Sequence, residues 1–339
     1  MGEKKLTRGL DPIHLEKFKN SEWFKKVYQK NKDELFLGIR NNYINIYYKG
    51  MNIAKSQGRF EKAYISDRYL GNKGESKEKS ISYDEFNKKG YETIIKNVEE
   101  HVNKEKKEKR EKRVQQELIL RNNENYKKGK SNWFCIDMEY SKQRKNKQEN
   151  QGENYGRFDI IAVNTRNKPY RVALIELKVG EGAISGESGL RKHALDWHKF
   201  KDKELFNKTE KNPENYLLKE IVEIINNNIY LEDGNYPIKK VNEKDFKTEP
   251  EFYFLICSGN MNFEEIKNET RKYLWSKEKC KQYGIKNVSS KNIEEDEEIG
   301  YDITKKGAGI LYCNFLFAEK EGENIEDIIE DKNYDRKIN

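Results

Sequence analysis

Three charged residues stand inside two of the most apolar segments of the chain. Asp159 interrupts one segment, and Glu176 and Lys178 interrupt the other, Arg171–Val179. Alternation along an extended strand places Glu176 and Lys178 on the same face. Burying an ion is unfavourable unless the ion is paired or holds a metal. The pattern therefore has two interpretations, a Glu–Lys ion pair at the end of a central strand or a site that does chemistry.

The short connection between the two segments favours the second interpretation. Asp159 belongs to the segment Arg157–Val163, and a tight connection at residues 164–169 leads to the next segment. Such a connection makes the segments antiparallel neighbours, which places position 159 opposite positions 175–176. Two carboxylates so close repel each other, and a hard divalent cation removes that repulsion. With the ammonium of Lys178 nearby, the set suits a metal ion and its activated water.

This arrangement resembles the PD-(D/E)XK nuclease superfamily, whose motif is an aspartate on one strand and (Asp/Glu)-x-Lys on the next. The motif here reads Gly156-Arg-Phe-Asp159 and, seventeen residues on, Glu176-Leu-Lys178, without the proline of the family name. The resemblance covers about residues 110–260. It implies that Asp159 and Glu176 ligate Mg²⁺ or Mn²⁺. Lys178 would orient or deprotonate the attacking water, or steady the scissile phosphate.

The same resemblance implies a nuclease that hydrolyses phosphodiester bonds, with DNA favoured over RNA because the superfamily mostly cuts DNA. Phage defence and restriction are the roles expected for such an enzyme. One alternative is a catalytically silent nuclease fold that binds nucleic acid or assembles with a protein. Another is a nuclease gated by a ligand or protein partner through the N-terminal region. Because cutting both strands usually needs two sites, a homodimer is expected.

Three further residues are candidates for the site. The superfamily often carries a glutamate on the helix before the first strand, and Glu117 fits that place, although it also fits an exposed helix face. Glu139 ends the first strand and is either a metal ligand or a solvated residue. His193 shares a helical stripe with Trp197 and therefore points inward. It is either a core histidine or a contact to phosphate or to a metal ligand.

A basic segment lies between the first two strands. Residues 142–147 carry four cations and no acid, namely Lys142, Arg144, Lys145 and Lys147. The net charge of the whole chain is +8, from 67 basic and 59 acidic residues, so this local cluster is more informative than the total. The segment is expected to overhang the site and contact nucleic-acid phosphates. A solvated loop is the alternative.

The elements that must position these residues follow a clear order. After a charged helix come three strands, two helices, a strand, a further helix and a final strand. The expected ranges are Trp133–Tyr140, Arg157–Val163, Arg171–Val179, Glu187–Phe206, Glu214–Asn227, Phe252–Cys257, Met261–Lys281 and Ile310–Phe317. This order predicts an α/β fold, with a restriction-endonuclease-like core in which helices flank a central mixed β-sheet.

The N-terminal part predicts a separate small α+β unit. Two strand-like segments flank the turn Asn41-Asn42, which is a hairpin signal. Helices are expected within 11–31 and 84–122, a third strand within 60–65, and a loop over 71–82. The expected domains are therefore 1–95, of unknown role, and 96–339, nuclease-like with an acidic C-terminal tail.

The remaining composition excludes several classes of protein. The four cysteines, Cys135, Cys257, Cys280 and Cys313, show no CxxC spacing, which argues against a zinc site or a disulfide framework. The chain has no 18-residue apolar stretch and no apolar N-terminal leader segment. The expectation is a soluble, cytoplasmic protein that does not bind membranes.

Overall fold

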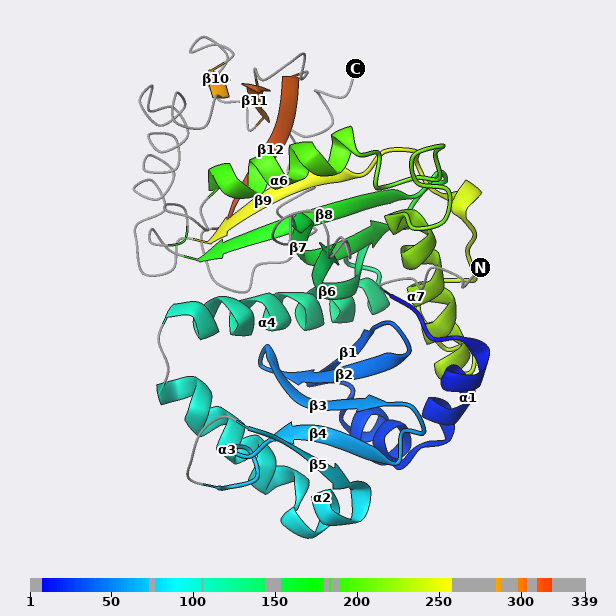
Figure 1. Cartoon of the computed structure of the whole chain (residues 1–339), viewed down its shortest axis with the longest axis vertical. Coiled ribbons are helices and arrows are strands. Elements are labelled where there is room, and N and C mark those ends of the chain that lie inside the picture. Colours follow the sequence, from blue (N-terminus) through cyan, green and yellow to red (C-terminus); the bar gives the residue numbers. More distant parts are fainter. Residues whose placement is uncertain are drawn as a thin grey trace, which may run out of the picture.

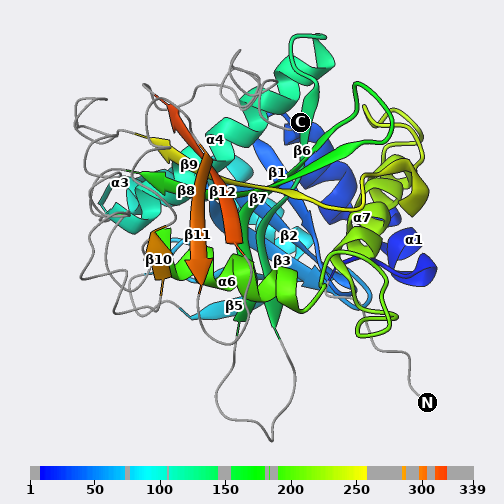
Figure 2. The same ribbon diagram turned by 90° about the horizontal axis from the view of Figure 1, so that it is seen from above.

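The computed structural model describes the backbone of residues 8–72, 77–104, 107–143, 154–179, 183, 190–257, 285–287, 298–303 and 310–318. These residues form a mixed α/β structure in which one antiparallel and one mixed sheet are flanked by helices (Figure 1). Seen from above, the N-terminal strands lie behind the larger sheet, so that the sheets are stacked as layers (Figure 2). Within the described part of the chain, no helix has both the length and the apolarity needed to span a membrane.

The N-terminal sheet contains β1 to β5 in chain order. Its first two strands form the predicted antiparallel hairpin, β1 (Leu35–Ile39) paired with β2 (Tyr43–Tyr48). The remaining strands are β3 (Met51–Gln57), β4 (Lys62–Ser66) and β5 (Glu78–Ser82). The prediction of a loop over 71–82 was wrong for its last residues, which form β5. This strand lies at the edge of the sheet, and Ile81 is its one buried side chain. Such a strand carries no alternating apolar pattern.

Helices complete the core of this sheet. They are α1 (Pro12–Asn20), a π-helix (Trp23–Tyr28), a 3₁₀ turn (Gln29–Asn31), α2 (Tyr83–Lys89) and α3 (Tyr91–Lys104). Asp11 caps α1 by accepting a backbone N–H of the first helical turn. Val98 and Val102 of α3 are buried in the same core, which therefore extends beyond the division expected at residue 95. The described residues within 8–104 are called the N-terminal unit below.

The larger sheet has the strand order β10-β11-β12-β9-β8-β7-β6. Its strands are β6 (Trp133–Gln143), β7 (Asn154–Asn164), β8 (Arg171–Val179), β9 (Glu251–Cys257), β10 (Ile285–Asn287), β11 (Glu298–Ile303) and β12 (Ile310–Ala318). Strands β6, β7 and β8 are antiparallel, whereas β9 runs parallel to β8 and β12. The predicted register is confirmed: Ile160 pairs with Ile175, so the next positions outward are Asp159 and Glu176.

Helices enclose the larger sheet on both faces (Figure 1). They are α4 (Lys107–Lys127), α6 (Leu190–Asp202), α7 (Leu217–Leu231) and a 3₁₀ turn (Glu243–Asp245). Helix α4 lies between the two sheets, where Phe36 of β1, Val114 of α4 and Ile160 of β7 share one core. Helices α6 and α7 pack against the opposite face of the larger sheet. The predicted order of helix, three strands, two helices and strand is confirmed, and the helix expected over 261–281 lies outside the described residues.

Gly50, between β2 and β3, lies against the backbone of α4. Its φ is 76°, and a Cβ added there would lie 2.2 Å from the Lys112 backbone oxygen. Gly58 has a similar φ of 69° with nothing within 4 Å of an added Cβ. We expect Gly50→Ala to lower the free energy of unfolding by about 2–4 kcal/mol and Gly58→Ala by about 1 kcal/mol, because only the first adds a backbone clash to the conformational strain. Urea denaturation measures both losses, and equal losses would contradict this packing.

Candidate active site

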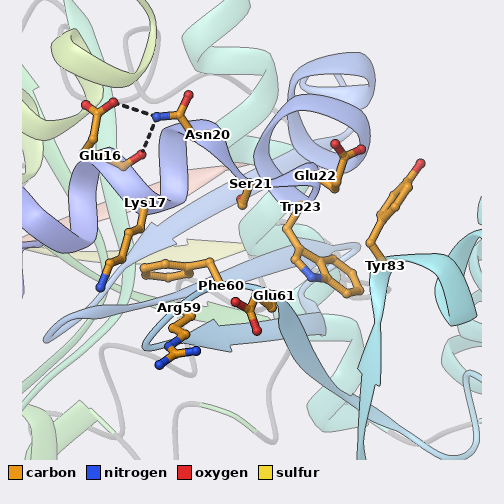
Figure 3. A pocket seen from close by; sticks show the side chains of 10 residues that line it. All are labelled: Glu16, Lys17, Asn20, Ser21, Glu22, Trp23, Arg59, Phe60, Glu61 and Tyr83. Carbon is orange, nitrogen blue, oxygen red and sulfur yellow. Dashed lines mark hydrogen bonds between the residues drawn. The ribbon is translucent and has the colours of Figure 1, made fainter.

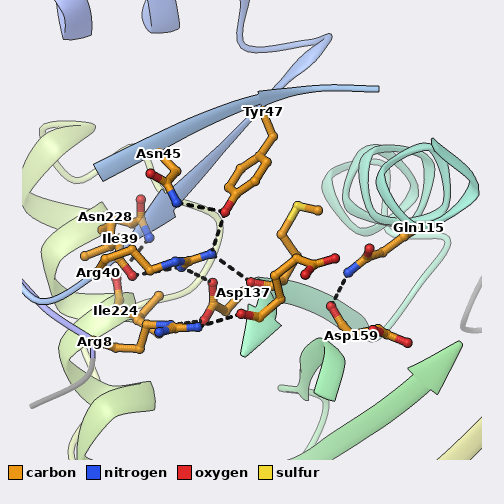
Figure 4. A network of polar contacts seen from close by, with 12 residues as sticks. Arg8, Ile39, Arg40, Asn45, Tyr47, Gln115, Asp137, Asp159, Ile224 and Asn228 are labelled. Atoms are coloured by element: carbon orange, nitrogen blue, oxygen red, sulfur yellow. Dashed lines mark hydrogen bonds and ion pairs between the residues drawn. The ribbon is translucent and has the colours of Figure 1, made fainter. Parts of the chain in front are cut away.

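The candidate active site lies where β8 ends beside the Asp159 segment of β7. The Leu177 N–H donates a hydrogen bond to Oδ2 of Asp159 at 2.7 Å, across the two strands. From α4, the Gln115 side chain donates a hydrogen bond to the Asp159 backbone oxygen (Figure 4). Both the carboxylate and the backbone of Asp159 are thus held at the edge shared with β8.

Glu176 and Lys178 lie on one face of β8 and contact each other. The distance from Lys178 Nζ to Glu176 Oε1 is 2.7 Å, and the two residues are 4% and 2% exposed. His193 of α6 lies against the same oxygen, with 3.0 Å from Nε2 to Oε1. The inward direction predicted for His193 is therefore confirmed, and its contact is the buried Glu176 carboxylate.

Glu139 of β6 joins this group from the other side of β7. The pairs Met138–Ile160 and Tyr140–Phe158 place position 139 opposite Asp159. Glu139 has a φ of 55°, and its Oε1 lies 3.9 Å from Lys112 Nζ. The residue expected at the end of the first strand therefore lies beside Asp159, in an unusual backbone conformation.

Helix α4 contributes a fourth acid, Glu111, that the sequence interpretation missed. The carboxylate of Glu111 accepts the Val179 N–H just beyond the motif on β8. Its charge also acts on Asp159, Glu176 and Lys178. Glu111 thus lies close to the motif residues, on the helix for which the resemblance implies a glutamate.

The structure does not bring Glu117 into the site. Its side chain is 45% exposed and lies 3.8 Å from Arg113 on the outer surface of α4. Glu117 lies six positions after Glu111, which rotates it by about 120° around the helix. A signal for Glu111 was present, since Val114, Gln115 and Leu118 follow it at helical spacings of three, four and seven residues and all three are buried.

These two glutamates of α4 form a matched pair for mutation. We expect Glu111→Gln to reduce any metal-dependent activity of the site about 10–100-fold, because the substitution removes a charge beside the motif residues. Glu117→Gln removes the same charge from the exposed face and is expected to change activity by about twofold or less. Rate measurements on both variants test the assignment, and a larger effect at Glu117 would reverse it.

Burial and mutual repulsion shift the titration of the acids. Burial raises the pKa of Glu176 well above its usual range, and the Asp159 charge adds to this. Burial also raises the pKa of Asp159 to about 7, with Lys178 opposing the shift. Burial is also the main cause that raises the pKa of Glu111. Burial disfavours the charged form of Lys178, but the surrounding carboxylates together have the larger effect and raise its pKa. Lys178 therefore remains an ammonium.

One observation indicates that the acids fit a divalent cation. Oε2 of Glu176 is buried and, within the described part of the chain, accepts no hydrogen bond. Carboxylate oxygens are the ligands that Mg²⁺ and Mn²⁺ prefer. Among the described residues, however, no three His, Cys, Asp or Glu side chains are gathered at metal-binding distances.

Other predicted features lie apart from this site. Cys135 and Cys257 are buried, as expected of small core residues. The predicted nucleic-acid contacts Arg144, Lys145 and Lys147, together with the side chain of Lys142, lie outside the described residues.

The N-terminal unit carries a pocket of about 410 Å³ between α1, the π-helix and the β3–β4 turn (Figure 3). Trp23, Phe60 and Tyr83 line it together with charged side chains. Two of these charges already have partners, since Glu16 accepts a hydrogen bond from Asn20 and Glu22 pairs with Lys26. No residue of β7 or β8 lines the pocket, so it is distinct from the candidate active site.

Comparison with known proteins adds no family to these observations. No protein-family model matches the chain, and neither the curated proteins nor the solved structures gave a match.

Proposed function

We propose that this chain is a metal-dependent nuclease with a restriction-endonuclease-like core that hydrolyses phosphodiester bonds in DNA. The observation that carries the proposal is that Asp159 and Glu176 lie directly next to the paired residues Ile160 and Ile175 of β7 and β8, with Lys178 2.7 Å from Glu176. Burial and mutual repulsion raise the pKa values of Asp159, Glu176 and Glu111, and a divalent cation would favour their charged forms. The order of α4, β6 to β8, α6 and β9 agrees with the order that the motif resemblance implies.

In the proposed reaction water attacks the phosphorus, an oxygen–phosphorus bond forms, and the bond to the 3′ oxygen breaks. The proton released by the water ends on the departing 3′ oxygen. Asp159 and Glu176 would hold Mg²⁺ or Mn²⁺, which supplies a water of lowered pKa and offsets charge at the phosphorus. Because Lys178 remains an ammonium, we assign it to donate to the scissile phosphate and not to remove a proton from water. His193, 3.0 Å from Glu176, would orient that carboxylate.

The test is incubation of the purified chain with supercoiled plasmid, linear duplex DNA, single-stranded DNA and RNA, each in Mg²⁺, Mn²⁺ or EDTA. We expect DNA cleavage that requires a divalent cation and is lost in Glu176→Ala. Cleavage that persists in EDTA or in this variant would overturn the assignment, and cleavage of RNA alone would overturn the choice of substrate. If no substrate is cut, Mn²⁺ titration followed by electron paramagnetic resonance decides, since a chain that binds no Mn²⁺ lacks the proposed site.

A further inference from the structure

Two buried arginines of the N-terminal unit reach the strand that carries Glu139 (Figure 4). Arg8 precedes α1 and Arg40 follows β1, yet both guanidiniums contact Asp137 of β6. Arg8 Nε and Arg40 Nη1 each lie 2.6 Å from a different oxygen of the Asp137 carboxylate. Arg8, Arg40 and Asp137 are 6%, 3% and 1% exposed, so the whole contact is inside the protein.

The same two guanidiniums also bind the backbone of the following residues. Arg40 Nη2 donates a hydrogen bond to the Met138 carbonyl at 2.8 Å, and Arg8 Nη2 donates one to the Glu139 carbonyl at 2.9 Å. Because guanidinium donors have a rigid fork geometry, such pairs fix the direction of the groups they bind as well as their distance. Three consecutive residues of β6 are thereby oriented by side chains from another layer of the molecule.

Glu139 has a backbone conformation that needs this support. A φ of 55° is left-handed, which is unfavourable by about 1–2 kcal/mol for a residue other than glycine. The strand changes face at this point: Met138 packs toward α4, whereas Tyr140 packs against Phe158 on the opposite side. A regular strand would keep positions 138 and 140 on the same face. The left-handed φ of Glu139 accompanies this change of face on β6.

The charges of this contact also favour a positioning role over simple docking. Two guanidiniums face one carboxylate, Asp137, and the surplus positive charge is met by backbone oxygens. Buried ion networks contribute little net stability compared with apolar packing, and their best-attested use is to specify one arrangement. The arrangement specified here is that of residues 137–139, whose last member lies opposite Asp159.

We propose that Arg8 and Arg40 are positioning residues of the active site. By fixing residues 137–139, they would hold the Glu139 carboxylate beside Asp159, where it contributes to divalent-cation binding. This inference rests on the proposed nuclease function and extends the site into the N-terminal unit. The cation site is then complete only while the N-terminal unit is docked on β6.

The test is Mn²⁺ binding followed by electron paramagnetic resonance, which requires no substrate to be cleaved. Arg40→Lys keeps the charge but loses the forked contact, and we expect the Mn²⁺ dissociation constant to rise about 10–100-fold. Arg8→Lys, which loses the contact to the Glu139 carbonyl, is expected to act in the same direction and serves if Arg40→Lys does not fold. In a Glu139→Ala background, Arg40→Lys should cause no further loss of Mn²⁺ affinity, because both changes remove the same contribution, that of the Glu139 carboxylate.

Asn227→Ala is the matched control. Asn227 of α7 accepts the Leu10 N–H at 2.8 Å, a hydrogen bond that also ties the N-terminal unit to the nuclease-like part and involves no residue of β6. We expect its Mn²⁺ affinity to equal that of the wild type. An unchanged affinity in Arg40→Lys, an equal loss in Asn227→Ala, or additive losses with Glu139→Ala would each overturn the inference while leaving the nuclease proposal intact. A wild-type chain that binds no Mn²⁺ would overturn both.

Discussion

Replacing Lys178 by methionine is expected to lower DNA cleavage about 10²–10³-fold without loss of Mn²⁺ binding. The ammonium lies 2.7 Å from Glu176 and is the cation assigned to the scissile phosphate. Methionine removes the charge and keeps the length of the side chain. Because Lys178 neutralises the same carboxylates that would ligate a metal, its removal leaves those carboxylates more attractive to a cation. The loss should therefore appear in the rate constant for cleavage of bound DNA and not in the affinity for Mn²⁺.

Lys199→Met is the control for this variant. Lys199 lies on the exposed side of α6, so the substitution makes the same change in charge away from the site. Its rate is expected to stay within about twofold of the wild type. Single-turnover cleavage with Mg²⁺, alongside Mn²⁺ titration of both variants, separates the outcomes. Wild-type rates in Lys178→Met would remove this lysine from the chemistry, and a parallel loss of Mn²⁺ binding would assign it a structural role instead.

The part of the site that sequence could predict is the part built from neighbouring residues. Asp159 and Glu176 are joined by one short connection, so the turn fixes the register and the register fixes the pairing. Strand alternation likewise places Glu176 and Lys178 together, and the helical stripe turns His193 inward. Each of these inferences needs only the periodicity of one strand or one helix over a few residues.

The parts that sequence could not predict depend on contacts between distant segments. Glu111 was overlooked because it lies in a segment dominated by lysine and glutamate, and the apolar residues at helical spacing from it, Val114 and Leu118, begin only after that segment. Arg8 and Arg40 carry no local pattern that points to Asp137, since that contact exists only once the N-terminal unit packs on β6. Local periodicity also gave no warning of the left-handed residue Glu139 inside a strand.

Asp159→Asn is expected to stabilise the metal-free protein at alkaline pH while removing its response to metal. Burial raises the pKa of Asp159 to about 7, whereas the unfolded chain has a value of about 4. The folded state therefore binds this proton more tightly. The resulting stability is fully present below about pH 4 and is lost as the pH rises through about 7. Asparagine never acquires the charge, and its side-chain oxygen can still accept the Leu177 N–H that Asp159 accepts at 2.7 Å.

In EDTA, the variant should exceed the wild type in free energy of unfolding by about 1–3 kcal/mol at pH 8, and by much less at pH 5. The lower part of that range reflects the partial exposure of Asp159, which weakens the burial effect. About 10 mM Mg²⁺ should narrow the difference at pH 8, since a dissociation constant near 1 mM adds roughly 1.4 kcal/mol to the wild type alone. Urea denaturation under these conditions gives both differences.

A difference in free energy of unfolding that does not change with pH would mean that Asp159 is not a buried acid of raised pKa. A Mg²⁺ response retained by Asp159→Asn would remove this residue from the cation site. Stabilisation without metal, joined to loss of cleavage, is the pattern expected when a fold retains an unfavourable buried charge for the sake of its chemistry.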